Sequence, residues 1–249
     1  MSKSFTLTNI SQLVTNNSAL GDGQLGVIND AAITVTDGIV SWVGQSSQAD
    51  SSVAKTDVGG RSLIPGFVDS HSHIMFAGDR SEEFAARMAG VPYSAGGIKV
   101  TTEATRKASD AELRAIAQSM IKEMQESGTT TIEIKSGYGL DVSTEERSLR
   151  IAAELTDEVT YLGAHVVAPE FAANPDDYVD LVVGEMLEAC APHSKWIDVF
   201  CDRGAFTTEQ SRRILEEGIK KGLHPRIHLN QLEQGDGVAM AIELDCASA

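Results

Sequence analysis

From about residue 62 onwards, short apolar runs alternate with amphipathic stretches, and this alternation constrains the fold more than any other feature of the sequence. The runs are rich in β-branched and aromatic residues, and the stretches between them have the apolar spacing of helices. Five strands are expected, at 67–76, 129–135, 159–165, 196–201 and 226–230. Such alternation indicates an α/β fold with a parallel sheet, whose site is built at the carboxyl ends of the strands.

The helices expected between these strands carry start and stop signals. Ser109, with Glu112 three residues later, has the pattern of a capping box, and Gly128 is placed to end that helix. Other helices are expected at 81–89, 97–107, 143–155, 174–190 and 208–222, with a last one after Gly237. Five strand–helix units are fewer than the eight that close a barrel, so 62–249 is expected to be a barrel domain that is incomplete at its C-terminal end.

Residues 1–61 differ in character and are expected to form a small β-rich domain. The segment 5–10 alternates apolar and polar residues, and the segments 32–36 and 39–43 flank Asp37-Gly38. Asp-Gly supplies the positive φ angles of a type I′ hairpin turn. Since this part has no cluster of titratable side chains, the chemistry is expected in 62–249.

The charge balance narrows the class of protein. There are 36 acidic residues against 20 basic ones, a net charge of −16, which argues against binding to nucleic acid or to an anionic membrane. No apolar run reaches the roughly 18 residues of a membrane span, and the N-terminus lacks the apolar core of a signal peptide. Cys190, Cys201 and Cys246 form neither a zinc spacing nor a disulfide framework. A cytoplasmic location is therefore expected.

Two histidines, His71 and His73, stand two residues apart near the end of the apolar run 63–76. In an extended strand, residues i and i+2 point to the same face, so the two imidazoles could share one metal ion. His228, on the expected fifth strand, could add a third nitrogen, and such a set suits zinc or iron. On spacing alone, an incidental His71/His73 pair and a single buried histidine at 228 are more common than a metal site.

Six stretches, at 65–73, 76–80, 133–141, 162–165, 198–206 and 227–231, carry further strand-end motifs. Together they resemble the amidohydrolase superfamily and, within it, the imidazolonepropionase family. The resemblance covers nearly the whole chain and implies a TIM-like (β/α)8 metal-dependent hydrolase barrel with a small composite β-sandwich domain. It implies a hydrolase acting on carbon–nitrogen bonds of cyclic amides, which converts 4-imidazolone-5-propanoate to N-formimidoyl-L-glutamate in histidine breakdown.

The resemblance also implies residue roles by position, with one divalent ion, Zn or Fe, as cofactor and a small molecule as substrate. The implied metal ligands are His71, His73 and His228. The implied substrate-binding residues are Arg80, Tyr138, His165 and Gln231, and His165 is also the implied catalytic donor or acid–base group. Without the resemblance, His165 could be a core histidine, Tyr138 an ordinary loop residue, and Arg80 a surface partner of Glu82 or Glu83.

The sequence departs from the family pattern in some places. Leu229 and Asn230 stand where alanine and an acidic residue are usual, and the family's fourth ligand, an aspartate on the eighth strand, lies outside this sequence. Lys135 is on the second strand, which points to one metal rather than two, and a salt bridge with Glu133 is its simplest role. Another cyclic-amide hydrolase or deaminase, an inactive truncated fragment and a homodimer stay open.

Overall fold

The computed structural model describes residues 3–79, 81, 88–89 and 97–249, and it comprises two compact units, Met1–Phe67 and Val68–Ala249. The first unit is one sheet with the strand order β3-β2-β1-β4. Its strands are β1 (Ser4–Val14), β2 (Val27–Thr36), β3 (Ile39–Gln45) and β4 (Lys55–Asp57), with a short 3₁₀ helix, η1 (Ser46–Gln48), after β3. Strand β2 is antiparallel to both β1 and β3, and β4 is parallel to β1.

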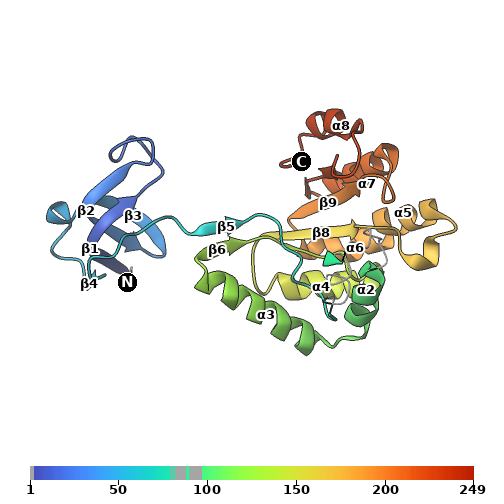
Figure 1. Cartoon of the computed structure of the whole chain (residues 1–249), viewed down its shortest axis with the longest axis horizontal. Coiled ribbons are helices and arrows are strands. Elements are labelled where there is room, and N and C mark those ends of the chain that lie inside the picture. Colours follow the sequence, from blue (N-terminus) through green and yellow to red (C-terminus); the bar gives the residue numbers. More distant parts are fainter. Residues whose placement is uncertain (1–2, 80, 82–87, 90–96) are drawn as a thin grey trace. The chain divides into compact units, whose positions relative to one another are not determined.

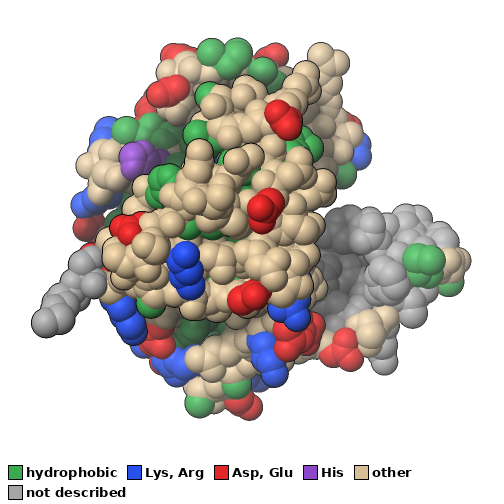
Figure 2. Space-filling model, turned by 90° about the vertical axis from the view of Figure 1, so that its left-hand side faces the viewer, with side chains coloured by type: hydrophobic (Ala, Val, Ile, Leu, Met, Phe, Trp, Pro, Cys, Tyr) green, Lys and Arg blue, Asp and Glu red, His purple; other side chains and the backbone are tan. Residues whose placement is uncertain are grey.

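The β2–β3 connection confirms the expected hairpin, because Asp37 and Gly38 have φ angles of 50° and 83°. The chain still pairs with β1 at Leu63, whose N–H donates to the Gln12 carbonyl at 2.9 Å. This pairing is why the first unit extends past residue 61. Seen from the left-hand side of Figure 1, the molecular surface is mostly backbone and side chains of other types, with scattered acidic, basic and hydrophobic side chains (Figure 2).

The second unit contains a five-stranded parallel sheet and a separate two-stranded sheet, and the strands follow one another in chain order (Figure 1). Its strands are β5 (Phe67–Asp69), β6 (Thr129–Ile132), β7 (Ile134–Lys135), β8 (Val159–Ala164), β9 (Trp196–Cys201), β10 (His224–Pro225) and β11 (His228–Leu229). Strand β5 pairs with β6, β7 with β8, and β8 with β9, while β9 pairs with both β10 and β11. A sequential parallel order is that of a barrel, and five strand positions make a partial one, as the sequence predicts.

Seven helices of the described residues accompany these strands. They are α2 (Gly97–Lys107), α3 (Asp110–Glu126), α4 (Val142–Ala152), α5 (Pro175–Val183), α6 (Glu185–Cys190), α7 (Thr208–Lys220) and α8 (Gly237–Glu243), with 3₁₀ turns η2 (Pro169–Phe171) and η3 (Ala191–His193). The predicted capping box at Ser109 and Glu112 is confirmed, but the helix expected at 174–190 is two helices, because Gly184 leaves the helical region. In the part of the chain that the structure describes, no helix is long and apolar enough to cross a membrane.

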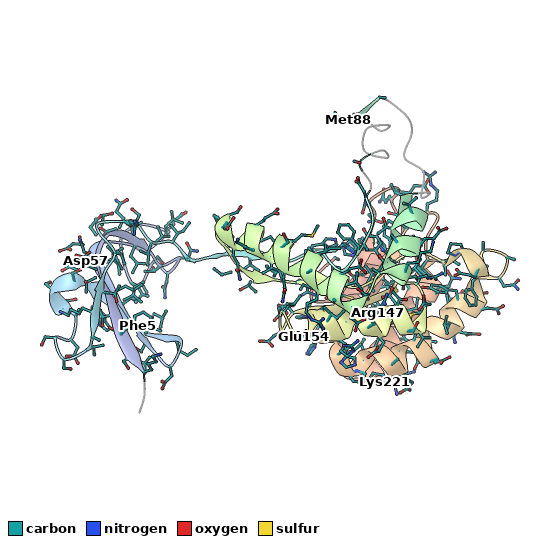
Figure 3. All side chains as sticks on the ribbon, turned by 90° about the horizontal axis from the view of Figure 1, so that it is seen from below. Phe5, Asp57, Met88, Arg147, Glu154 and Lys221 are labelled. Carbon is teal, nitrogen blue, oxygen red and sulfur yellow. The ribbon has the colours of Figure 1, made fainter. Side chains whose placement is uncertain are left out.

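Arginine side chains fasten α4 to the helices before it (Figure 3). The Arg147 guanidinium donates to the carbonyls of Thr105 and Ala108, at 2.7 and 2.8 Å, where α2 ends. Cationic donors at this end of a helix satisfy carbonyls that have no partner within the helix. The Glu154 carboxylate, just after α4, receives two bonds from Arg114 of α3, at 2.7 and 2.8 Å. Both contacts fix α4, which precedes β8 in the sheet.

The first barrel strand is much shorter than predicted. It ends at Asp69, whose carboxylate accepts the N–H of His71 at 3.1 Å. The apolar run 63–76 is typical of a strand that is buried on both faces of a parallel sheet. That expectation is wrong for β5, because Phe67 and Val68 are 56% and 65% exposed. Among the described residues β5 pairs with β6 alone, which leaves its apolar side chains uncovered. The fifth strand is likewise interrupted, since β10 and β11 are separate two-residue pairings.

Candidate functional site

The segment that carries His71 and His73 is held beside β6 and β7 although it is not a strand. The N–H of Glu133 donates to the Asp69 carbonyl at 2.8 Å, and the N–H of Lys135 donates to the Ser72 carbonyl at 3.0 Å. The Ser72 hydroxyl, which is buried, donates back to the Glu133 carbonyl at 2.5 Å. These bonds on both sides of Ser72 place the two imidazoles at the end of the sheet.

Three imidazoles are in direct contact there. The His71 and His73 rings lie 4.9 Å apart with their Nε2 atoms separated by 3.1 Å. His228, which β11 brings from a position 157 residues later, lies with its Nε2 atom 3.0 Å from His71 Nδ1. The structure therefore brings together the three histidines that the sequence proposes as metal ligands.

Two more predicted site residues join this cluster. The His165 ring, just after β8, stacks on His73 at 5.1 Å between centroids. The Tyr138 ring lies 5.7 Å from that of His73 and 5.4 Å from that of His165. Four of the six histidines of the chain and one tyrosine thus meet at one place, from four separate strand ends.

A buried carboxylate stands behind His228. Asp198 of β9, which is 0% exposed, accepts from His228 Nδ1 at 2.9 Å. Its carboxylate also receives the Lys135 ammonium at 2.8 Å, and Lys135 in turn pairs with Glu133 at 2.9 Å, as the sequence predicts for that pair. Burial alone would raise the pKa of Asp198, but the His228 bond and the Lys135 charge lower it to about 2.

The Asp198 carboxylate sets the proton positions of the rings in their neutral state. Because the carboxylate can only accept, His228 carries its proton on Nδ1 and its Nε2 accepts from His71 Nδ1. The Nε2 atom of His71 then accepts from Nε2 of His73. This order leaves Nδ1 of His73 with a lone pair, and that atom is buried without a hydrogen-bond partner among the described residues.

His71, His73 and His165 are held in the neutral form, in which imidazole binds metals. Burial, with the neighbouring His165 and His71, lowers the pKa of His73 to about 2. Burial and then His228 lower the pKa of His71, and burial lowers that of His165 despite its bond to the Gly137 carbonyl.

Three neutral imidazole nitrogens are therefore the right type of ligand for a divalent ion. Nitrogens that share a tetrahedral zinc ion lie about 3.3 Å apart, given Zn–N bonds of about 2.0–2.1 Å, close to the 3.0 and 3.1 Å separations here. His71, however, faces its two neighbours with different nitrogens, so its ring would have to turn. As the rings stand, no group of three His, Cys, Asp or Glu side chains in 3–79, 81, 88–89 and 97–249 is arranged to hold a metal.

Of the other two predicted residues, one is described by the structure, and it lies outside the cluster. Gln231 lies in the exposed loop after β11, where its backbone N–H donates to Asp202 at 2.8 Å. Arg80 lies outside the described residues. Sequence reasoning assigned no role to Asp198 or to Glu145, a fully buried carboxylate of α4. Asp198 could have been noticed because it is a charged residue inside the apolar strand run 196–201. Charged residues are seldom buried without a partner, so its position indicates a buried ion pair.

Known proteins resemble the chain along its whole length. An imidazolonepropionase from Streptomyces coelicolor is 59% identical over 250 residues, which cover 100% of this chain and 64% of that protein. An imidazolonepropionase from Mycolicibacterium smegmatis is 58% identical, over 98% of this chain and 61% of the relative. The chain thus spans about three fifths of the length of these curated relatives.

Solved structures share the fold at low sequence identity. A 5-methylcytosine deaminase from Klebsiella pneumoniae superposes with a TM-score of 0.61 at 14% identity, covering 95% of this chain and 54% of its own. A triazine hydrolase variant gives a TM-score of 0.59 at 18% identity, covering 97% and 55%. The amidohydrolase family model matches residues 62–244, which is nearly all of the second unit. On this match, with the relatives and the partial parallel barrel in agreement, the chain belongs to the amidohydrolase family.

Proposed function

We propose that the protein to which this chain belongs hydrolyses the ring amide of 4-imidazolone-5-propanoate and releases N-formimidoyl-L-glutamate, a step of histidine breakdown. The observation that carries the proposal is the 59% identity to a curated imidazolonepropionase along the whole chain. The clustered rings of His71, His73, His165, His228 and Tyr138 support it, because several imidazoles at one place can bind a divalent ion for metal-assisted hydrolysis.

His71, His73 and His228 are proposed to hold one divalent ion, zinc or iron. When bound, such an ion lowers the pKa of a coordinated water and polarises a carbonyl oxygen. In this proposal the Asp198 carboxylate keeps the His228 proton on Nδ1, which leaves Nε2 for the ion. Carboxylate partners of this kind orient metal-binding histidines and raise their basicity.

His165 is proposed to move a proton at its Nε2 atom. Its Nδ1 lies 2.9 Å from the Gly137 carbonyl, which can only accept, so the neutral ring is protonated on Nδ1. The lone pair of Nε2 is then available to take a proton from the attacking water or the substrate. The Tyr138 ring, beside His73 and His165, would form a flat wall for a planar heterocycle.

Arg80 and Gln231 complete the proposed substrate set. A guanidinium suits the propionate tail of the substrate, because it can bind a carboxylate through two parallel hydrogen bonds. Gln231 would recognise polar atoms at the ring edge. We also propose a cytoplasmic location, and a small molecule as the binding partner in place of nucleic acid or a membrane. A homodimer is proposed as well, and sedimentation would test that oligomeric state.

The direct test is the disappearance of imidazolone absorbance with purified protein reconstituted with zinc or iron. His71→Ala should abolish turnover, while the matched control His224→Ala, at an exposed position beside Trp196, should keep it. Hydantoins and guanine assayed in parallel distinguish another cyclic-amide hydrolase or a deaminase. Turnover of those compounds but not of imidazolone, or full activity in His71→Ala, would contradict the proposal.

A further inference from the structure

The loop between β7 and α4, residues 136–141, is held by the carboxylate of a fully buried side chain. Glu145 of α4 is 0% exposed, and its side chain turns back toward this loop. Its Oε1 accepts the N–H groups of Gly139 and Leu140 at 2.7 and 2.8 Å, and its Oε2 accepts that of Gly137 at 2.9 Å.

An arginine holds the same loop by its carbonyl groups. Arg106, at the end of α2, donates from Nε to the Gly139 carbonyl at 2.7 Å and from a terminal nitrogen to the Leu140 carbonyl at 3.2 Å. It also pairs with Asp141 at 2.8 Å and with Glu170. Glu145 and Arg106 thus fix the loop from its N–H side and its carbonyl side.

The backbone of this loop is strained enough to need such restraint. Leu140, which is buried, has a φ angle of 57°, a conformation that bulky side chains rarely adopt. Gly137 has a φ angle of 108°, and a Cβ atom there would lie 2.9 Å from the Leu162 carbonyl oxygen. Strained conformations persist only where the surroundings over-determine them.

Helix capping does not explain Glu145. The N-cap of α4 is Asp141, whose side chain accepts the N–H of Thr144 at 2.8 Å. The N–H groups bound by Glu145 all precede the helix. The carboxylate therefore serves the loop, and burying it there is costly unless all its acceptor positions are filled.

The loop in turn determines the position of two site groups. It carries Tyr138, whose ring lies against His73 and His165, between the two glycines whose N–H groups Glu145 binds. It also supplies the Gly137 carbonyl that fixes the proton of His165 on Nδ1. We propose that Glu145 is a positioning residue, which with Arg106 holds the loop 136–141 so that Tyr138 stays beside His73 and His165 keeps Nε2 unprotonated. The inference rests on the function proposed for these rings.

The test is Glu145→Gln, which keeps the size of the side chain but turns an amide NH₂ toward backbone donors. Nitrogen-15 NMR of the imidazoles in the whole chain should show His165 in the Nδ1–H form, and in the variant a mixed or Nε2–H form. With imidazolone, kcat should fall about tenfold to hundredfold, as for a group displaced by about 1 Å. Ser109→Ala, which removes a cap of α3 away from the loop, is the control for a general loss of stability.

The outcomes separate the inference from the proposed function. An unchanged His165 tautomer and unchanged kcat in a folded Glu145→Gln protein would overturn the inference, even if its melting temperature fell. If the His165 tautomer changes in Glu145→Gln but the unaltered protein does not turn over imidazolone, the inference stands and the proposed function is refuted. If Glu145→Gln does not fold, Arg106→Met removes the carbonyl contacts instead, and retention of the Nδ1–H tautomer there overturns the inference.

Discussion

Replacing Lys135 by methionine should lower the free energy of unfolding of the second unit by about 3–5 kcal/mol, the typical cost of removing one partner of a buried ion pair. The Lys135 side chain is 1% exposed, and its ammonium lies 2.8 Å from Asp198 and 2.9 Å from Glu133. Methionine fills most of the space but leaves the carboxylates without that charge. Arg226 still reaches Glu133 at 2.6 Å, so the uncompensated charge is that of Asp198.

Urea denaturation followed by circular dichroism measures this loss. The matched control is Lys122→Met, because Lys122 is 76% exposed and lies 3.8 Å from Glu126. Surface pairs of this kind contribute about 0–1 kcal/mol. Adding Asp198→Asn to Lys135→Met should give a coupling of at least about 1 kcal/mol between the two sites. A loss below about 1 kcal/mol in Lys135→Met alone would refute the reasoning.

Three further substitutions test parts of the fold. Ser109→Ala removes the capping box of α3 and should lower stability by about 1 kcal/mol, seen as a melting temperature about 2–4 °C lower; an unchanged value would contradict it. Tyr161→Phe leaves the buried Val182 carbonyl without its 2.9 Å bond and should cost about 1–3 kcal/mol in urea titrations. Gly137→Ala places a methyl group 3.1 Å from His165 Nδ1 and should shift the His165 imidazole signals, whereas Gly23→Ala, in open space, should not.

Local patterns in the sequence predicted much of the fold. The strand at 196–201 has the predicted bounds, and the capping box at Ser109 lies where it was expected, because both depend on residues close together in the chain. The positive φ angles at Asp37 and Gly38 follow from the residue types in the same way. The meeting of His71 with His228 was predictable because parallel strands end at one edge of the sheet.

Features that depend on distant partners were not predictable. The first barrel strand stops at Asp69 because pairing, and not apolarity, decides where a strand ends. The partners of Asp198 are far from it in the sequence: His228 is 30 residues away and Lys135 is 63 residues away. Glu145 is close in sequence to the loop that it holds, yet nothing in the pattern shows that its side chain turns back. The sequence has a glycine at the helix break, Gly184, but an isolated glycine does not by itself predict a break, because helices often tolerate one.

The central claim is that three imidazoles from two distant segments bind one ion. Zinc K-edge absorption spectroscopy of the purified protein, loaded with one equivalent of Zn²⁺, tests it directly. The account predicts a zinc shell that contains three imidazole nitrogens at about 2.0–2.1 Å, and the loss of one of them in His228→Ala. A shell of oxygen ligands, or one that is identical in His228→Ala and the unaltered protein, would contradict it.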